Sequence, residues 1–306
     1  MNYDLIVLGG GPAGYVGAIR AAQLGKKVAC VENDRAGGTC LNWGCIPTKA
    51  LLKNAELYHT LTHRAEEFGL KIGSIEYDWS KVIGRSRGVS DKLNKGIEFL
   101  FKKNKVDYVK GWGKFKSANE IDVDVVGGGK ETIRAKNVII ATGSEPCPLP
   151  GNAIPVDEKY VVTSTGGLSL EKIPKRMVVI GAGVIGLELG SVYRRLGTEV
   201  IVVGNTERIC PFMDVELSNA FKKSLDKQGF KFILKSKVTG GSGGPNGCKV
   251  IIESVDGSAP IQNLECDTIL VSTGRRAFTE GLQLNNVGLA VDKYGKIETN
   301  EHFQTA

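Results

Sequence analysis

The sequence predicts an α/β fold built from two related halves, and three observations carry that prediction. An apolar β-forming run, a glycine-rich turn and an alanine-rich helical segment follow one another between residues 4 and 24. The same order returns between residues 176 and 203, so the chain repeats one βαβ unit. The 306 residues are 42% hydrophobic and include 40 glycines, a composition that suits two packed domains with many tight turns.

The first unit has the glycine spacing of a dinucleotide-binding turn. Three glycines with G-x-G-x-x-G spacing follow its first expected strand: Gly9, Gly11 and Gly14. In that arrangement the first glycine permits the turn, the second lets the backbone approach a pyrophosphate, and the third lets the helix pack on the strand. A second strand, expected at residues 27–31, ends in Glu32, whose carboxylate can accept hydrogen bonds from an adenosine ribose. The alternative to a dinucleotide site is that these glycines form an ordinary βα turn.

A pair of cysteines, Cys40 and Cys45, follows in a stretch that is bounded by glycines and a proline. Positions five apart point about 140° away from each other in an ideal helix, so a disulfide here needs a distorted turn. Gly44 and Pro47 supply the backbone freedom and the stop for such a turn. A helix N-terminus and the charge of Lys49 would stabilise a thiolate. We interpret the pair as a redox-active dithiol with a strained, reducible disulfide.

Two other interpretations of this pair stay open, namely a structural disulfide and a metal site. Cys-x4-Cys opens a plant-type iron–sulfur motif, but that motif needs a further cysteine where Thr48 stands. No second pair completes a zinc site, since the other cysteines are isolated in the sequence: Cys30, Cys147, Cys210, Cys248 and Cys266. We therefore expect no metal.

The middle of the first half predicts helices and then strands. Residues 51–68 are expected to form a helix that carries His59 and His63, whose spacing could hold a metal but lacks an acidic or cysteine partner. Surface or packing histidines are therefore the expectation. A lysine-rich amphipathic helix is expected at residues 80–104. Alternating patterns then predict strands at residues 108–115, 120–126, 130–135 and 137–144.

The second unit repeats the pattern and departs from it at one position. Its phosphate-binding glycines are Gly181, Gly183 and Gly186. The strand at residues 199–203 is followed by Gly204, where a ribose-binding acid would stand, so preference for NAD over NADP loses its electrostatic basis. Only Arg208, behind Glu207, offers a positive charge for an NADP phosphate. Further on, a helix is expected at residues 214–228, strands at 231–238, 249–254 and 267–275, and a flexible turn at 240–247.

Three motifs together resemble the pyridine nucleotide–disulfide oxidoreductases, most closely their dihydrolipoamide dehydrogenase branch. They read Val-Leu-Gly-Gly-Gly-Pro-Ala-Gly-Tyr, Cys-Leu-Asn-Trp-Gly-Cys-Ile-Pro-Thr-Lys and Gly-Ala-Gly-Val-Ile-Gly-Leu-Glu-Leu-Gly. The resemblance spans residues 1–306 and implies two Rossmann-like domains of the FAD/NAD(P)-binding fold. It implies an FAD-binding domain at 1–150, an NAD-binding domain at 151–275 and an incomplete return to the FAD domain at 276–306.

The resemblance also implies an activity, the oxidation of dihydrolipoamide by NAD with FAD as the intermediary. Cys45 would face the flavin, Cys40 would exchange with lipoamide, and Lys49 would pair with Glu188 near the flavin and nicotinamide. Further cofactor contacts are implied for Thr39, Gly113, Thr142, Gly143, Ser144 and Gly274, beside Lys49, Glu188, Glu32 and the six motif glycines. A lipoyl-bearing protein of a 2-oxo acid dehydrogenase complex would be the partner, and the full-length family forms homodimers.

Two departures from the family pattern qualify this expectation. The family's second FAD-binding segment and its C-terminal dimerisation domain, with a His-Glu acid-base pair, are absent, and His302 does not replace that histidine. Family enzymes that use NAD carry Glu where this chain has Gly204. We therefore expect a fragment that binds FAD weakly or not at all and has impaired turnover. An NADPH-dependent disulfide or mercuric reductase and a non-catalytic dinucleotide-binding fragment are the alternatives.

Composition excludes several other classes. The net charge of +7 is spread among intermixed acidic and basic residues, which argues against a nucleic-acid partner. The apolar runs are too short to span a bilayer. Seven cysteines without a signal peptide suggest a reducing compartment, either the cytoplasm or, for a processed eukaryotic chain, the mitochondrial matrix.

Overall fold

The computed structural model describes residues 2–306, which divide into two compact units. Unit 1 contains the residues up to Ile46 together with Gly88–Glu145 and Arg275–Ala306, and unit 2 contains Pro47–Arg87 and Pro146–Gly274. The boundaries drawn from the sequence assign residues 47–87 to the first domain, whereas the structure groups them with the second. The expected α/β class is confirmed, and each unit contains one βαβ element.

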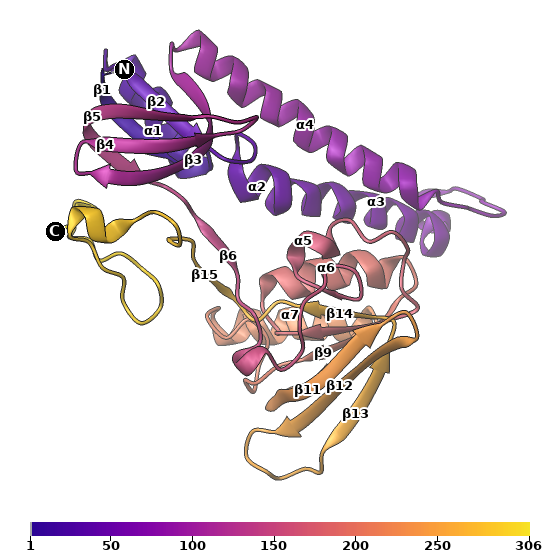
Figure 1. Ribbon diagram of the computed structural model, residues 1–306. Helices are drawn as coiled ribbons and strands as arrows, with labels where there is room; N and C mark the ends of the chain where they lie inside the picture. Colours follow the sequence, from indigo (N-terminus) through magenta and orange to yellow (C-terminus); the bar gives the residue numbers. More distant parts are fainter. Residues whose placement is uncertain (1) are drawn as a thin grey trace. The chain divides into compact units, whose positions relative to one another are not determined.

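Unit 1 is built on a closed five-stranded barrel with the order β1-β2-β3-β4-β5 (Figure 1). Its strands are β1 (Asn2–Leu8), β2 (Val28–Glu32), β3 (Asp107–Ser117), β4 (Glu120–Val125) and β5 (Lys130–Ile140). Strand β1 pairs in parallel with both β2 and β5, while β3, β4 and β5 form an antiparallel meander. The two strands expected at 130–135 and 137–144 are therefore one strand, because its pairing moves from β4 to β1 without a break.

Alternation along the strands divides the core of unit 1 into two clusters. Ile6 and Leu8 of β1 point into the barrel with Ile121 and Ile133, while Val7 points outward. Outside the barrel, Val7 belongs to the cluster that includes residues of α1 (Pro12–Gln23) and of the C-terminal part of α4 (Trp79–Lys103). A strand whose two faces are both buried needs apolar residues at successive positions, as this strand has.

Unit 2 contains a parallel sheet with the order β10-β9-β8-β14-β7. Its strands are β7 (Val161–Val162), β8 (Arg176–Ile180), β9 (Glu199–Val203), β10 (Lys231–Ile233) and β14 (Thr268–Val271). One face packs against α6 (Val184–Arg195), α7 (Val215–Lys227) and residues of α3 (Cys45–His63). The other face packs against the antiparallel sheet of β11 (Ser236–Gly244), β12 (Gly247–Ser254) and β13 (Gln262–Cys266). Burial on both faces explains the continuous Val and Ile runs.

The glycine-rich segment expected as a flexible turn at 240–247 is mostly strand. Strand β11 continues through Gly244 in register with β12. A Cβ atom on Gly241 would lie 2.2 Å from Lys249 O and 2.7 Å from the Ile154 side chain. Glycine is therefore required by close packing of the hairpin on its neighbours, which a local reading of Gly-Gly as a turn does not reveal.

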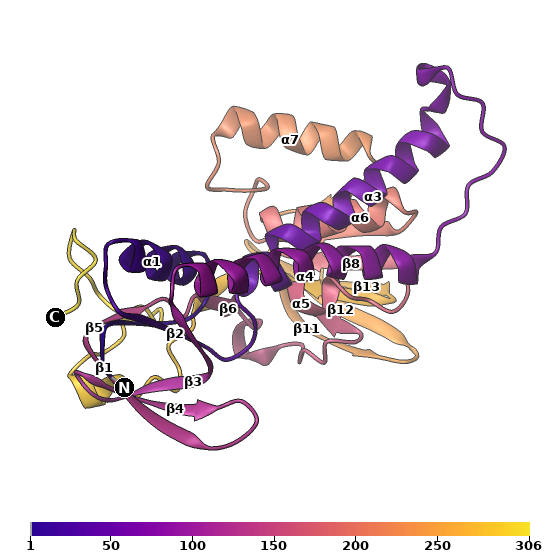
Figure 2. The same ribbon diagram turned by 90° about the horizontal axis from the view of Figure 1, so that it is seen from above.

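Four passages of the chain connect the two units. Two run through the long helices α3 and α4, which Figure 2 shows from above. The other two run through the short strands β6 (Ser144–Pro146) and β15 (Arg275–Ala277), which pair with each other. The helix expected at 51–68 begins earlier, at Cys45, and ends at His63 before a 3₁₀ turn at Ala65–Phe68.

Within residues 2–306, none of the helices combines the length and the apolar character that a membrane crossing requires.

Candidate functional site

The first glycine turn, between β1 and α1, is held by backbone contacts that exclude side chains. Gly9 has φ of 103°, and a Cβ atom there would lie 2.3 Å from Ala141 O. A Cβ atom on Gly14 would lie 1.8 Å from Gly9 O, so α1 rests directly on the turn. These two glycines are explained by the fold itself.

The middle glycine of the motif is different, because packing does not explain it. A Cβ atom on Gly11 would meet only Gly38 Cα, at an ordinary 3.8 Å. Gly11 is the N-cap of α1, and no side chain caps the first turn of this helix. The free N–H groups of that turn are therefore available to an anion. This arrangement fits a phosphate that approaches the helix N-terminus.

Glu32 closes β2 beside this turn. One carboxylate oxygen accepts a hydrogen bond from Gly10 N at 2.7 Å, and the other accepts one from Asp34 N at 2.9 Å. The side chain is buried, yet each oxygen keeps a further lone pair for a ligand hydroxyl. The predicted ribose contact therefore fits the position and stays a prediction.

The start of α2 (Gly38–Trp43) packs against the same turn, which sequence reasoning missed. Gly38 has φ of 56°, and a Cβ atom on it would lie 2.5 Å from Gly11 Cα. Gly37, with φ of 94°, precedes it as the N-cap. The available signal was the Gly-Gly pair directly before Thr39. This close approach brings Thr39 and Cys40 next to the glycine turn of unit 1.

The two cysteines lie on different helices, because the backbone breaks at Gly44, where the sequence predicted only a distorted turn. Cys40 is in the middle of α2, and Cys45 is the first residue of α3. A Cβ atom on Gly44 would lie 2.9 Å from Thr39 O and 3.5 Å from Cys40 Cα, so the chain folds back over α2. Both cysteines are thiols here, half-buried at Cys40 and exposed at Cys45. Their redox role stays a prediction.

The position of Cys45 suits a thiolate. It begins a helix of 19 residues, where backbone N–H groups and the helix dipole stabilise negative charge. Pro47 occupies the first turn, where its missing N–H group breaks no helical hydrogen bond. Sequence alone placed the cysteine near a helix start, and the structure places it at the first residue.

Within unit 2, Lys49 of α3 pairs with Glu188 of α6, as the resemblance implied. Lys49 Nζ lies 2.6 Å from Glu188 Oε1, and the two side chains are 60% and 26% exposed. An ion pair with this exposure stabilises a fold by at most about 1 kcal/mol. Its importance is therefore positional, since it ties α3 to the helix that begins at the second glycine turn.

The second glycine turn, between β8 and α6, repeats the geometry of the first. A Cβ atom on Gly181 would lie 2.4 Å from Ser272 O, and one on Gly186 would lie 2.8 Å from Gly181 O. Around Gly183, the N-cap of α6, a Cβ atom would meet no described atom within 4 Å. The outer glycines serve packing, and the open middle glycine again fits the approach of a phosphate.

Position 204 lies at the end of β9 and carries no charge. A Cβ atom on Gly204 would lie 3.0 Å from Ala182 Cβ and 3.2 Å from Leu234 Cδ2, so the position is enclosed. Arg208 donates a hydrogen bond to Pro211 O at 2.8 Å, and Glu207 lies 3.7 Å from Lys235. At position 204 and its described neighbours, the structure therefore shows neither a pair of basic side chains for an NADP phosphate nor a carboxylate for an NAD ribose.

The predicted cofactor-lining residues after β5 contact the returning chain of unit 1. Thr142 Oγ1 donates to Phe278 O at 2.6 Å, and Phe278 N donates to Gly143 O at 3.0 Å. Arg275 Nε donates to Ser144 Oγ at 2.8 Å. The segment is thus held in place by hydrogen bonds with residues 275–278, and its contact with a flavin stays a prediction.

Two other predicted glycines differ in how well packing explains them. A Cβ atom on Gly113 would lie 2.8 Å from Leu8 Cδ2 and 3.2 Å from Val31 Cγ1, so this glycine is required by the barrel core. Gly274, with φ of 140°, has no described atom within 4 Å of a Cβ position and lies where the chain leaves unit 2. Their cofactor contacts stay predictions.

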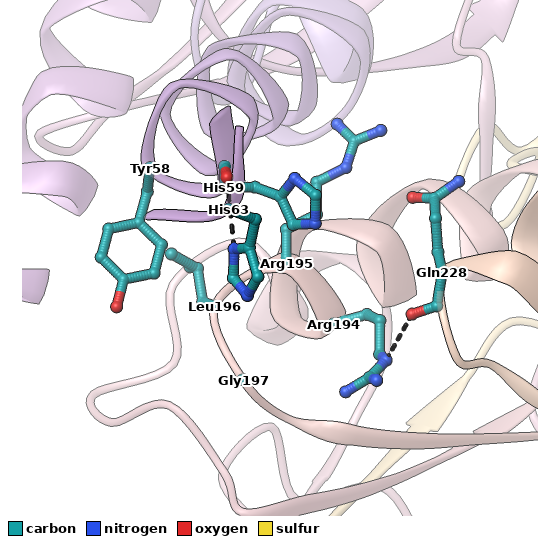
Figure 3. A pocket seen from close by; sticks show the side chains of 8 residues that line it. All are labelled: Tyr58, His59, His63, Arg194, Arg195, Leu196, Gly197 and Gln228. Atoms are coloured by element: carbon teal, nitrogen blue, oxygen red, sulfur yellow. Dashed lines mark hydrogen bonds between the residues drawn. The ribbon is translucent and has the colours of Figure 1, made fainter. Parts of the chain in front are cut away.

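His59 and His63 line a pocket of about 190 Å³ within unit 2 (Figure 3). Their rings stack with centroids 4.5 Å apart. Arg194 and Arg195 line the same pocket, and Arg194 Nε donates to Gln228 O at 2.7 Å. Burial, His63 and the arginines lower the pKa of His59 below 6.5. The positive charges oppose a cation, and no group of three metal-ligating side chains lies within residues 2–306.

Comparison with known proteins finds similar sequences over nearly the whole chain. The pyridine nucleotide-disulphide oxidoreductase family matches residues 3–306. The mitochondrial dihydrolipoyl dehydrogenase of Pisum sativum is 50% identical over 304 residues, which are 99% of this chain and 60% of that protein. The leghemoglobin reductase of Vigna unguiculata is 50% identical over 303 residues, 99% of this chain and 57% of that protein.

A solved structure shares the fold. The Cu(II) complex of RclA, an HOCl-induced flavoprotein disulfide reductase from Escherichia coli, superposes with a TM-score of 0.83 at 26% identity. The alignment covers 100% of this chain and 64% of that one. The chain spans between 57% and 63% of the length of the curated relatives it matches.

Proposed function

Because the chain belongs to the pyridine nucleotide-disulphide oxidoreductase family, we propose that it carries the redox core of a flavin-dependent dithiol oxidoreductase that oxidises dihydrolipoamide with NAD. The observation that carries this proposal is the backbone break at Gly44. It separates Cys40 on one helix from Cys45 at the first residue of the next. A purely structural disulfide gains nothing from a sulfur at a helix N-terminus, whereas this position lowers the pKa of a thiol and favours an active thiolate.

The two glycine turns supply the cofactor sites of the proposal. Proteins of this family use FAD and NAD. The first turn and Glu32 would hold the adenine dinucleotide part of FAD, and the second turn would hold NAD. The open positions at Gly11 and Gly183 support this assignment, because packing does not explain either glycine. When bound, FAD takes the electron pair of the dithiol and passes it to NAD.

The residues of this chain carry out the thiol exchange. A substrate thiolate attacks Cys40 Sγ of the Cys40–Cys45 disulfide, the S–S bond breaks, and Cys45 leaves as a thiolate. The second substrate thiol then displaces Cys40, closes the substrate disulfide and leaves both cysteines reduced. The N-terminus of α3 stabilises the Cys45 thiolate. Lys49, held by Glu188, adds positive charge further along the same helix.

The visible absorption spectrum of the purified chain tests this proposal. When dithiothreitol is added under argon, the flavin spectrum should gain a long-wavelength shoulder, because the reduced Cys45 thiolate would lie against the flavin. The Cys45→Ser variant should lose the shoulder, and the matched Cys147→Ser variant should keep it. A yellow protein without the shoulder would contradict the assigned role of Cys45. A colourless protein would agree with the expected weak FAD binding; if it stays colourless after FAD is added, it would support the non-catalytic alternative.

A second candidate is a disulfide reductase that uses NADPH, and Gly204 is the observation that favours it. The acid that would repel an NADP phosphate is missing at this position. Rates with NADH and NADPH separate the two candidates. Preference for NADH that increases in Gly204→Glu supports the dihydrolipoamide reaction. Preference for NADPH overturns it.

The partner in this proposal is a lipoyl-bearing protein of a 2-oxo acid dehydrogenase complex, and the assembly is a homodimer. Relatives named as mitochondrial dihydrolipoyl dehydrogenases support this proposal and a mitochondrial matrix location. An isolated reduced lipoyl domain should be oxidised by the protein with NAD present. The Cys40→Ser variant should not oxidise it, because the exchanging sulfur is gone.

A further inference from the structure

Two cysteines that are isolated in the sequence lie directly opposite each other in unit 2. Cys248 of β12 and Cys266 of β13 are register partners in the antiparallel sheet. Directly opposed residues have Cα atoms about 4.5–5.5 Å apart and side chains on one face. That separation lies inside the range over which a disulfide can form. The two cysteines are therefore isolated in the sequence but adjacent in the sheet.

The two side chains are buried together. They are 5% and 7% exposed and belong to the cluster between the antiparallel sheet and the parallel sheet. The Cys248 thiol is positioned to donate to two carbonyl oxygens, Asp267 O at 3.4 Å and Tyr160 O at 3.7 Å. The next register pair on the same face is Val250 with Leu264, so this face is otherwise filled by larger aliphatic residues.

The chemistry of the pair differs from that of a single buried cysteine. A hydrogen bond from the Cys266 thiol lowers the pKa of Cys248 and raises that of Cys266. Burial alone acts in the opposite direction, as at Cys30, whose pKa it raises to about 12. A single buried cysteine behaves as a small inert hydrophobe, whereas a paired thiolate is a nucleophile.

We propose that Cys248 and Cys266 form a second redox site, a dithiol that hydroperoxides convert into a cross-strand disulfide. This site is separate in sequence and in unit from Cys40 and Cys45. Strand β13 is an edge strand that pairs only with β12 among the described strands. Local opening of such an edge gives a small oxidant access to the sulfurs.

The reaction balances with hydrogen peroxide as the oxidant. The Cys248 thiolate attacks one peroxide oxygen, the O–O bond breaks, and the released hydroxide takes a proton to become water. Cys248 is then a sulfenic acid. The Cys266 thiol attacks its sulfur, the S–O bond breaks, and the second oxygen leaves as water. The two sulfurs have given one electron pair to peroxide, and an added dithiol returns it by thiol exchange.

Peptide mapping tests this proposal without any activity measurement. The protein is treated with hydrogen peroxide, its remaining thiols are alkylated under denaturing conditions, and it is digested with trypsin without reduction. Cleavage after Lys249 separates the two cysteines into peptides 238–249 and 250–275. We expect these two peptides to be linked and to separate after treatment with dithiothreitol. The linkage should also form in Cys40→Ser/Cys45→Ser, which removes the first dithiol.

Single variants identify the order of events and provide controls. Cys266→Ser should leave Cys248 as a sulfenic acid that dimedone traps, whereas Cys248→Ser should give little trapping on Cys266. Cys210→Ser, which removes a single buried cysteine, should leave the linkage unchanged. The proposal is overturned if both peptides stay fully alkylated while Cys147 is oxidised, or if Cys248 links instead to another cysteine.

Discussion

At the residue scale, the glycines of the first turn separate two kinds of requirement. Gly14 has no room for a side chain, because the backbone of Gly9 occupies the Cβ position. Gly17, on the same helix, has only Ile139 Cδ1 near its Cβ position, at 3.8 Å. Two glycines three residues apart therefore have opposite tolerance for the same substitution.

We predict that Gly14→Ala destabilises the protein by about 3 kcal/mol or more, because the new methyl group forces α1 away from the turn. The matched change Gly17→Ala should be stabilising by up to about 1 kcal/mol, as expected for alanine in a helix interior. Urea denaturation of both variants measures the difference. Equal losses of unfolding free energy would contradict the close contact with Gly9 O.

Lys49 is another residue whose role depends on position more than on stability. We predict that Lys49→Met changes the unfolding free energy by less than about 1 kcal/mol, because the ion pair with Glu188 is exposed. We expect it to slow flavin reduction by a dithiol about tenfold, which corresponds to a loss of about one pKa unit of thiolate stabilisation, roughly 1.4 kcal/mol. Stopped-flow absorption measures that rate.

The control for this prediction lies on the same helix. Lys53 pairs with Glu56 at 3.0 Å on the surface of α3. Lys53→Met should leave the flavin reduction rate unchanged. A similar loss of rate in both variants would assign the effect to the general charge of the helix instead of the Lys49–Glu188 pair.

His59 gives a prediction about pH. Its pKa in the folded protein lies below 6.5, so the unfolded chain binds more protons between the two values. Stability should therefore fall as the pH decreases from about 6.5 toward the folded pKa. NMR titration of the ring protons measures the pKa, and denaturation at several pH values measures the slope. His59→Gln should reduce this slope, whereas His302→Gln, at an exposed position near the C-terminus, should leave it unchanged.

At the scale of elements, the caps decide where helices begin. Helices α1 and α6 have Gly11 and Gly183 as their N-caps, and a glycine has no side chain with which to cap the first turn. Helix α7 is capped by Asp214, whose Oδ1 accepts hydrogen bonds from Glu216 N at 2.9 Å and Leu217 N at 3.3 Å. The uncapped N-termini of α1 and α6 can therefore bind an anion, whereas the N-terminus of α7 is already occupied by Asp214.

We predict that Asp214→Ala costs about 1 kcal/mol of stability, because the two N–H groups lose their acceptor. Asn219→Ala, at an exposed position inside the same helix, should be neutral or slightly stabilising. Thermal or urea denaturation followed by circular dichroism compares the two variants. An unchanged stability in Asp214→Ala would mean that water replaces the cap without cost.

At the scale of the whole molecule, the returning chain completes unit 1. Phe115 N donates to Leu282 O at 2.9 Å, and Asn286 Nδ2 donates to Phe115 O at 2.8 Å. Leu282 is 3% exposed and belongs to the barrel cluster. A segment that follows the whole of unit 2 in sequence is thus part of the core of unit 1.

We predict that Leu282→Ala destabilises unit 1 by about 2–5 kcal/mol, because it leaves a cavity in the barrel cluster. Amide hydrogen exchange should become faster in β1–β5 and stay unchanged in β8 and β9, since the two units have separate cores. Tyr294→Ala, at a 62% exposed position of the same segment, is the matched control. Faster exchange throughout both units would show that they unfold together.

The sequence by itself determined the features that depend on local backbone geometry. The glycine turns, the order of strand and helix and an irregular backbone at Gly44 were predictable, because each depends on the conformational freedom of adjacent residues. The middle glycines, which packing leaves unexplained, were also recognisable from their spacing. The family resemblance rests on these same local motifs.

Only the tertiary structure decided which distant residues meet. The grouping of residues 47–87 with unit 2, the extended strand through Gly240–Gly244 and the opposed Cys248 and Cys266 were missed. The physical reason is that strand register and the packing of sheets depend on contacts between segments far apart in the chain, about which local propensity carries no information.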